Sequence, residues 1–149
     1  MHRTTAADVV ARRCSGPRSP GGDQVAARLG REWQRLRLDP GALRRADKWR
    51  IVDSSPRDLD EVLTAVGFGV GRSAEADRRL TALVALAASD DLAGRVVIQR
   101  LMPGLLAEAA RRRASGRCDV LDELVGAAWI SIRTYNQTRR PGCIAAALL

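Results

Sequence analysis

The sequence predicts an all-α fold: a single small domain of about six to seven helices over residues 23–149, preceded by a disordered arm at residues 1–22. Two observations lead to this fold class. Apolar residues recur at three- and four-residue steps in successive stretches, which is the spacing of one helix face, and no stretch has the pattern of a strand. Residues that start and stop helices separate these stretches at short intervals. With 149 residues, the chain is long enough to bury one hydrophobic core.

The domain is predicted to be built round an antiparallel helical hairpin over residues 92–135. Because the link at residues 114–118 is short, each arm is best placed to cover the apolar stripe of the other. We therefore expect Leu105, Leu124 and Ala128 to be buried between the arms. The first stripe consists of Leu92, Val96, Leu101, Leu105 and Ala109, and the second of Leu121, Leu124, Val125, Ala128, Ile132 and Tyr135.

The N-terminal arm at residues 1–22 is predicted to be disordered because serine, proline and glycine are dense there and leave little apolar surface to pack. It contains four arginines and a single acidic residue, Asp8. A basic arm can touch nucleic acid, but such a segment is more often a solvated tail. We favour the solvated tail.

The first two predicted helices cover residues 23–36 and about 40–52. The second begins at an Asp-Pro pair, because aspartate accepts free amide hydrogens and proline has none to lose. Each helix places one tryptophan, Trp33 or Trp49, on its apolar face. The residues around Trp49 make its helix the most basic in the chain, and such a tryptophan could stack on bases. We favour burial for both because tryptophan has a large apolar area.

The next two predicted helices start at Ser55-Pro56 and at Ser73 and end near residues 66 and 88. Acidic residues crowd the first turns of the earlier one, where they stabilise the free amides, and capping explains them better than paired catalytic carboxylates would. The glycine-rich link at residues 67–71 lacks the preceding strand and the following Lys-Ser/Thr of a phosphate-binding loop. It is predicted to be a flexible connector.

The arms of the hairpin have their own start and stop signals. Residues 89–91 cap the first arm, and Pro103 must bend or restart it because proline cannot donate to the preceding turn. The arginines at 111–113 have a structural interpretation, because cations are favourable at the negative end of the helix dipole. The alternative interpretation is that they contact phosphates of a nucleic acid. Asp119 is expected to cap the second arm. Residues 136–149 are predicted to form a loop and the start of another helix.

The net charge of +8 comes almost wholly from arginine, because Lys48 is the only lysine among 25 basic residues. A GC-rich coding sequence favours arginine and alanine, so codon bias accounts for this composition slightly better than selection for phosphate contacts does. A surface this positive should nevertheless attract nucleic acid or acidic partners non-specifically. The candidate nucleic-acid-binding residues are clustered arginines, which can neutralise several phosphates together: Arg44, Arg45, Arg111, Arg112, Arg113, Arg139 and Arg140.

The sequence offers little material for catalysis. His2 is the only histidine, and the three cysteines, Cys14, Cys118 and Cys143, lack the spacing of metal ligands. We expect free thiols, no metal site, no cofactor, no catalytic residue and no identifiable small-molecule substrate, so an enzyme is the least favoured class. No apolar run approaches the roughly 18 residues of a membrane span, and the N-terminus lacks a secretory signal. A cytoplasmic location without a membrane partner is expected.

The hairpin also has a recognisable order of residues. Leu101, Pro103, Leu105 and Leu106 precede the basic pair Arg111 and Arg112, and after a short turn come Glu123, Leu124, Val125, Gly126, Ala127, Ala128 and Trp129. This pattern, over about residues 90–149, resembles the core-binding second region of bacterial RNA polymerase sigma factors.

The resemblance implies a partner surface on the second arm. In the family a Gln and a Glu stand where this chain has Gly126 and Ala127, and that polar face engages the coiled coil of the polymerase's largest subunit. The corresponding candidate partner-binding residues here are Glu123, Gly126 and Ala127. The basic and aromatic residues with which the family melts and reads promoter DNA are largely absent.

Two functional hypotheses follow. The leading one is a sigma-factor-like, DNA- or transcription-associated regulatory protein that lacks a complete promoter-reading apparatus. Its expected partners are DNA, bound non-specifically, or the RNA polymerase core. The alternative is a helical protein-protein interaction module without a nucleic-acid role. Gly126 and Ala127 favour this alternative because small residues suit close helix packing.

Overall fold

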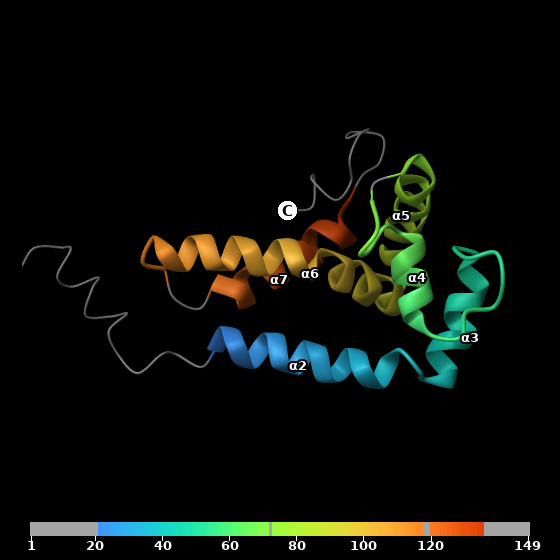
Figure 1. The fold of residues 1–149 in the computed structure, drawn as a ribbon, viewed down its shortest axis with the longest axis horizontal. Helices are drawn as coiled ribbons and strands as arrows, with labels where there is room; N and C mark the ends of the chain where they lie inside the picture. The colour runs from blue at the N-terminus through green and yellow to red at the C-terminus, as the bar shows by residue number, and fades with distance from the viewer. Residues whose placement is uncertain (1–20, 72, 118–119, 136–149) are drawn as a thin grey trace, which may run out of the picture.

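The structure is a computed structural model that describes residues 21–71, 73–117 and 120–135 (Figure 1). These residues form six α-helices and no strand, so the predicted all-α class is confirmed. The predictions for residues 1–20, for Asp119 and for residues 136–149 lie outside the described residues. The helices are α2 (Gly21–Leu36), α3 (Pro40–Trp49), α4 (Leu59–Ala65), α5 (Ala74–Ala87), α6 (Asp91–Ala114) and α7 (Val120–Arg133).

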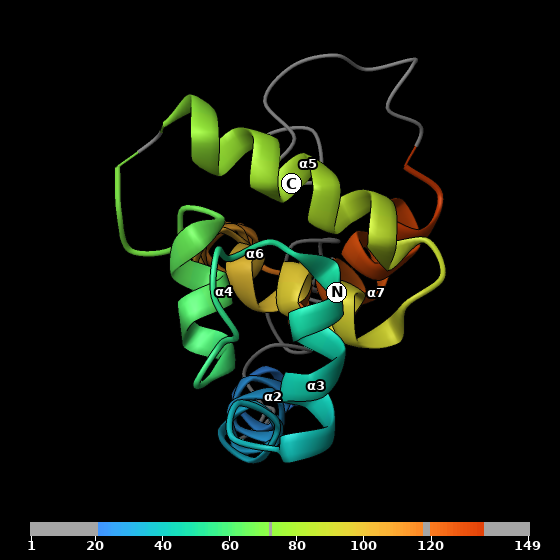
Figure 2. The ribbon, with the colours of Figure 1, turned by 90° about the vertical axis from the view of Figure 1, so that its right-hand side faces the viewer.

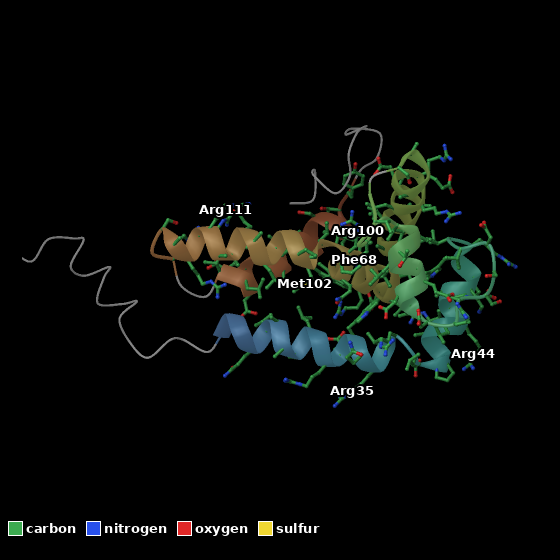
Figure 3. The ribbon with its side chains drawn as sticks, viewed as in Figure 1. Arg35, Arg44, Phe68, Arg100, Met102 and Arg111 are labelled. Carbon is green, nitrogen blue, oxygen red and sulfur yellow. The ribbon has the colours of Figure 1, made fainter. Side chains whose placement is uncertain are left out.

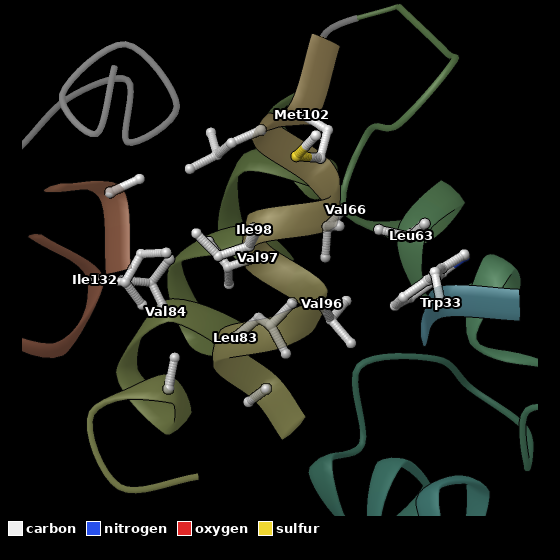
Figure 4. Packing of buried hydrophobic residues seen from close by; sticks show 14 of the residues in the cluster. Trp33, Leu63, Val66, Leu83, Val84, Val96, Val97, Ile98, Met102 and Ile132 are labelled. Atoms are coloured by element: carbon white, nitrogen blue, oxygen red, sulfur yellow. The ribbon is translucent and has the colours of Figure 1, made fainter. Parts of the chain in front are cut away.

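Helix α6 is the centre of the fold. Figure 2 shows α4, α5 and α7 arranged around it, and all three pack against it. Every residue from 92 to 98 is buried, so the first half of α6 is covered on all sides and not on one stripe alone. In Figure 4, residues 96–98 lie among Leu83 and Val84 of α5, Ile132 of α7 and Trp33 of α2. Apart from Gly94 and Arg95, this half is apolar all round, as expected for a helix in the core.

The two predicted apolar stripes of the hairpin arms both belong to the core. All five residues of the first stripe are buried. In the second, Val125 and Tyr135 are half-buried and the others are buried. Helices α6 and α7 pack against each other, and the antiparallel course of the two arms stays a prediction. Helix α6 continues through Pro103 without restarting.

The caps of three helices agree with the sequence. Asp39 accepts a hydrogen bond from the backbone N–H of Ala42 at 2.7 Å, and Ser73 accepts one from Ala76 at 3.0 Å. Asp90 caps α6. Each oxygen satisfies an amide that has no partner within its helix.

The start of α4 differs from the prediction. Asp58, and not Ser55, is the cap, and its Oδ1 accepts a hydrogen bond from the N–H of Glu61 at 3.0 Å. The Glu61 Oε2 atom in turn accepts one from the N–H of Arg57 at 3.1 Å, so the chain around this cap is held from both sides. The Leu59 N–H also donates to the carbonyl of Arg37 at 3.0 Å, which ties the start of α4 to the end of α2.

Two other helix boundaries also differ. Helix α2 begins at Gly21, two residues inside the predicted arm. Helix α3 ends at Trp49 and not near residue 52, because Arg50 adopts a left-handed conformation with φ of 55°. A residue in that conformation ends a helix, a role more often taken by glycine.

Gly94 marks a close approach between α6 and α7. A Cβ atom built on Gly94 would lie 3.0 Å from the Cη2 and Cζ3 atoms of the Trp129 ring. Ordinary carbon contacts are longer than this, so any side chain here would have to displace the indole. The ring of Trp129 therefore sits directly against the backbone of α6.

Candidate nucleic-acid and partner surfaces

The arginine cluster at the end of α6 is partly neutralised by its own helix. Arg111 and Arg112 both donate to Glu108, with an Nε–Oε2 distance of 2.9 Å for Arg111 and an Nε–Oε1 distance of 2.7 Å for Arg112. These hydrogen bonds lower the pKa of Glu108 below its ordinary value, because they favour the charged carboxylate. Arg113 is exposed. Two structural factors therefore account for arginines at this helix end: the helix dipole and the carboxylate of Glu108.

The two predicted arginines of α3 have different surroundings. The Arg45 Nη2 atom lies 2.6 Å from Oδ1 of Asp90. Arg44 is exposed and forms no ion pair with a described residue. Figure 3 shows Arg44 and Arg111 at opposite ends of the molecule, so these two predicted clusters do not form one surface. Arg139 and Arg140 lie outside the described residues.

Asp90 joins α3 to the start of α6. Its Oδ1 accepts from the N–H of Leu92 at 2.9 Å and of Ala93 at 3.2 Å, and its Oδ2 accepts from Nε1 of Trp49 at 3.0 Å. Burial alone would raise the pKa of Asp90. The hydrogen bonds from Trp49 and Ala93, together with the charge of Arg45, outweigh burial and lower the pKa below its ordinary value of 3.8.

We predict that Asp90→Asn lowers stability at pH 7 by about 1 kcal/mol, because one acceptor and the charge facing Arg45 are lost. A carboxylate whose pKa is lowered in the folded state stabilises the fold above its unfolded pKa, and this contribution is lost as pH falls through the folded pKa. The difference between wild type and variant should therefore shrink below about pH 4. Urea unfolding at several pH values measures it.

Asp91→Asn is the matched control for that measurement. Asp91 follows Asp90 in the chain, but its side chain is 75% exposed and its partner is Arg133. An exposed ion pair contributes little, so the control should change stability by less than about 0.5 kcal/mol at pH 7. Equal losses in the two variants would contradict the special role of Asp90.

Arg95 is a buried charge between α2 and α6. The residue is 7% exposed, and its three nitrogens donate to Oε1 of Glu32 at 3.0 Å, Oε1 of Gln99 at 3.1 Å and the carbonyl of Leu29 at 2.7 Å. Its Cζ lies 5.5 Å from the centroid of the Trp33 ring. Burial lowers the pKa of Arg95, and the charge of Glu32 opposes that shift. With its nitrogens engaged, Arg95 links α2 to α6 and is almost wholly shielded from solvent.

The predicted candidate set omits three arginines on α2. Arg28, Arg31 and Arg35 follow one another at steps of three and four residues, which places them on one face of the helix. All three are exposed, and none forms an ion pair with a described residue. Glu32, the acidic residue among them, is bound to Arg95. The spacing that predicts the apolar stripe of α2 could have identified this basic stripe as well.

Positive charge is concentrated in residues 24–50. This segment contains eight basic and three acidic residues, a net charge of +5 out of +8 for the whole chain. Arg37 and Arg45 are paired with Asp60 and Asp90. The remaining basic residues are exposed and unpaired among the described residues. Counting Arg50, which directly follows α3, we call them the unpaired cations of α2 and α3: Arg28, Arg31, Arg35, Arg44, Lys48 and Arg50.

The predicted partner-binding residues lie on the outer face of α7. Glu123, Gly126 and Ala127 are all exposed. Oε2 of Glu123 lies 3.0 Å from Nη2 of Arg117, and a Cβ on Gly126 would have no atom within 4 Å. Ile130, one turn further along, is 64% exposed. This face is open to solvent and combines small residues with one large apolar side chain.

His2 and all three cysteines lie outside the described residues. Within the described ranges, no three histidine, cysteine, aspartate or glutamate side chains come together as metal ligands would. None of the helices seen in the structure is both long and apolar enough to cross a membrane. Comparison of the chain with protein-family models, with curated proteins and with solved structures found no match in any of the three.

Proposed function

We propose that the protein is a DNA-associated regulatory protein of transcription, of the sigma-like kind suggested by residues 90–149, and that it binds nucleic acid non-specifically. One observation carries this proposal. The six unpaired cations of α2 and α3 are grouped in one segment of the chain and are not neutralised by described carboxylates. Such a group can neutralise several phosphates at once. The resemblance to sigma factors favours DNA as the nucleic acid.

The binding mechanism is electrostatic. Each phosphate that an arginine or lysine neutralises releases condensed counterions from DNA, and this release makes affinity depend steeply on salt. The described residues with aromatic rings are buried or half-buried, so they offer no open platform on which bases could stack. The contacts are then to phosphates, which carry no sequence information. We therefore expect little preference for sequence.

We predict that the full chain binds a mixed-sequence DNA duplex at low salt, with a slope of log K against log salt of about −3 to −5. Fluorescence anisotropy of a labelled duplex over a salt titration measures this slope. A duplex of the same length and different sequence is the control, and its affinity should agree within a few-fold. Absence of binding even at low salt would contradict the proposal.

The second candidate is a helical protein-protein interaction module. The outer face of α7 favours it, because Gly126, Ala127 and Ile130 are exposed there and carry no charge, beside the ion-paired Glu123. Small residues allow another helix to approach closely, and a large apolar side chain supplies area to bury. Failure of DNA binding at low salt would promote this candidate over the nucleic-acid one.

A further inference from the structure

We propose that the outer face of α2 is the surface that contacts the phosphate backbone of duplex DNA, and that Arg28, Arg31 and Arg35 are the contacts. We call these three residues the α2 arginine row. The inference rests on the proposed nucleic-acid function and goes beyond it, since it selects one helix face and one form of nucleic acid.

The geometry of α2 groups the three charges. At a rise of 1.5 Å per residue, Arg28 and Arg35 are about 10 Å apart along the helix axis, with Arg31 between them. A rotation of about 100° per residue keeps all three within roughly 60° around the axis. Figure 3 shows Arg35 pointing away from α6 and α7. The row therefore presents three guanidinium groups to the same side.

The orientation of α2 is fixed by its other face. Val25 and Trp33 are buried in the core, and α2 packs against α7. Arg95 of α6 holds Glu32 and the carbonyl of Leu29. Because its apolar residues are committed to the core, α2 cannot insert them into a lipid surface as an interfacial amphipathic helix does. Its free face suits a polyanion in water.

The cluster at the end of α6 is a natural comparison. It also has three arginines in succession, but Glu108 on the preceding turn binds Arg111 and Arg112. Between Arg28 and Arg35 the only acidic residue is Glu32. Its carboxylate is paired with the buried Arg95, so it neutralises that charge and not the α2 arginine row. For equal numbers of arginines, the α2 arginine row therefore has the larger uncompensated charge.

The aromatic residues favour a duplex over a single strand. Binding of single strands relies on exposed rings on which bases stack. Nε1 of Trp33 donates to Asp60 at 2.9 Å, and Nε1 of Trp49 donates to Asp90 at 3.0 Å. The ring of Trp129 lies against Gly94. Without a described exposed ring, the attraction comes from phosphates alone, and a duplex presents them at twice the density along its axis.

The test uses the full chain and two triple variants of equal charge. In the first, Arg28→Gln, Arg31→Gln and Arg35→Gln are combined. In the second, the arginines at 111–113 are all replaced with glutamine. Glutamine keeps a long polar side chain and good helix propensity, and circular dichroism verifies that both variants are folded. The probes are a labelled mixed-sequence duplex and one of its strands, each titrated with salt.

We expect the first variant to lose about tenfold or more in duplex affinity at low salt and to show a slope smaller by about 3, since three phosphate contacts are gone. The second variant should lose less than a third of the fold-change in duplex affinity that the first variant loses. Wild type should bind the duplex more tightly than the single strand.

Each other outcome is decisive. Equal losses of duplex affinity in the two variants, or a stronger loss in the second, would show that the α2 arginine row is not the phosphate contact. The proposed function would remain in place. Tighter binding of the single strand would overturn the preference for a duplex. Wild type that fails to bind either probe at low salt would remove the proposed function itself, and the inference with it. Phosphatidylserine vesicles are a third probe, and binding of the vesicles in place of the duplex would have the same effect.

Discussion

Leu124→Ala should lower the free energy of unfolding by about 2 to 5 kcal/mol, the usual cost of emptying a buried leucine site. Leu124 is 8% exposed and belongs to the buried apolar cluster that joins α7 to α6. Alanine removes the contacts of the isobutyl group, and the neighbouring helices can only partly close the space left behind. Urea unfolding followed by circular dichroism measures the loss.

Leu106→Ala is the matched control for Leu124→Ala. It makes the same chemical change, but Leu106 of α6 is 40% exposed. Its variant should stay within about 0.5 kcal/mol of wild type. A loss below about 0.5 kcal/mol for Leu124→Ala would place that side chain outside the core.

Arg95→Ala is expected to cost about 2 to 4 kcal/mol. The substitution removes the three hydrogen bonds of the buried guanidinium and the cation over the Trp33 ring. The expected cost comes from these lost charge-assisted hydrogen bonds and from the volume that the long side chain leaves empty between α2 and α6. The same unfolding experiment measures it.

Two variants make the Arg95 result specific. Arg78→Ala removes an arginine whose side chain is 73% exposed and whose partner is Glu75 on the same helix, and it should cost less than about 1 kcal/mol. Arg95→Met fills most of the volume without a charge, and it should lose less than Arg95→Ala. If Arg78→Ala and Arg95→Ala lower the free energy of unfolding equally, the buried position of Arg95 does not add to stability.

Helix periodicity made much of the fold predictable. The stripes of the hairpin arms and the burial of Trp33 follow from three- and four-residue spacing, which depends on helix geometry alone. Caps such as Asp39 and Ser73 were predictable because their hydrogen bonds are local.

The start of α4 was not predictable from the same signals. Both Ser55 and Asp58 carry a capping side chain. The choice between them coincides with the hydrogen bond from Leu59 to Arg37, two residues far apart in the sequence. The full burial of the first half of α6 was missed for a related reason, since Gly94 and Arg95 interrupt its apolar run.

Which arginines are available for a nucleic-acid surface depends on which of them are paired with carboxylates. Pairs between residues close in the sequence can be predicted from the sequence, and pairs between distant residues cannot. The pairs of Glu108 with Arg111 and Arg112 were within reach of sequence reasoning, because residues three and four apart meet on a helix. The pairs Arg45 with Asp90 and Arg95 with Glu32 join residues 45 and 63 positions apart. No local rule selects those partners, and so the freedom of the α2 arginine row became visible only in the structure.

The contact between Gly94 and Trp129 constrains how this protein can diverge. The missing side chain of one residue makes the space that the indole of the other occupies, so the two positions share a single volume. A mutation that enlarges residue 94 is tolerable once residue 129 has become smaller, an order that passes through a cavity, whereas the reverse order passes through a steric clash. In lineages that keep this helix pairing, the two positions should therefore change together, as a correlated pair in their evolutionary history.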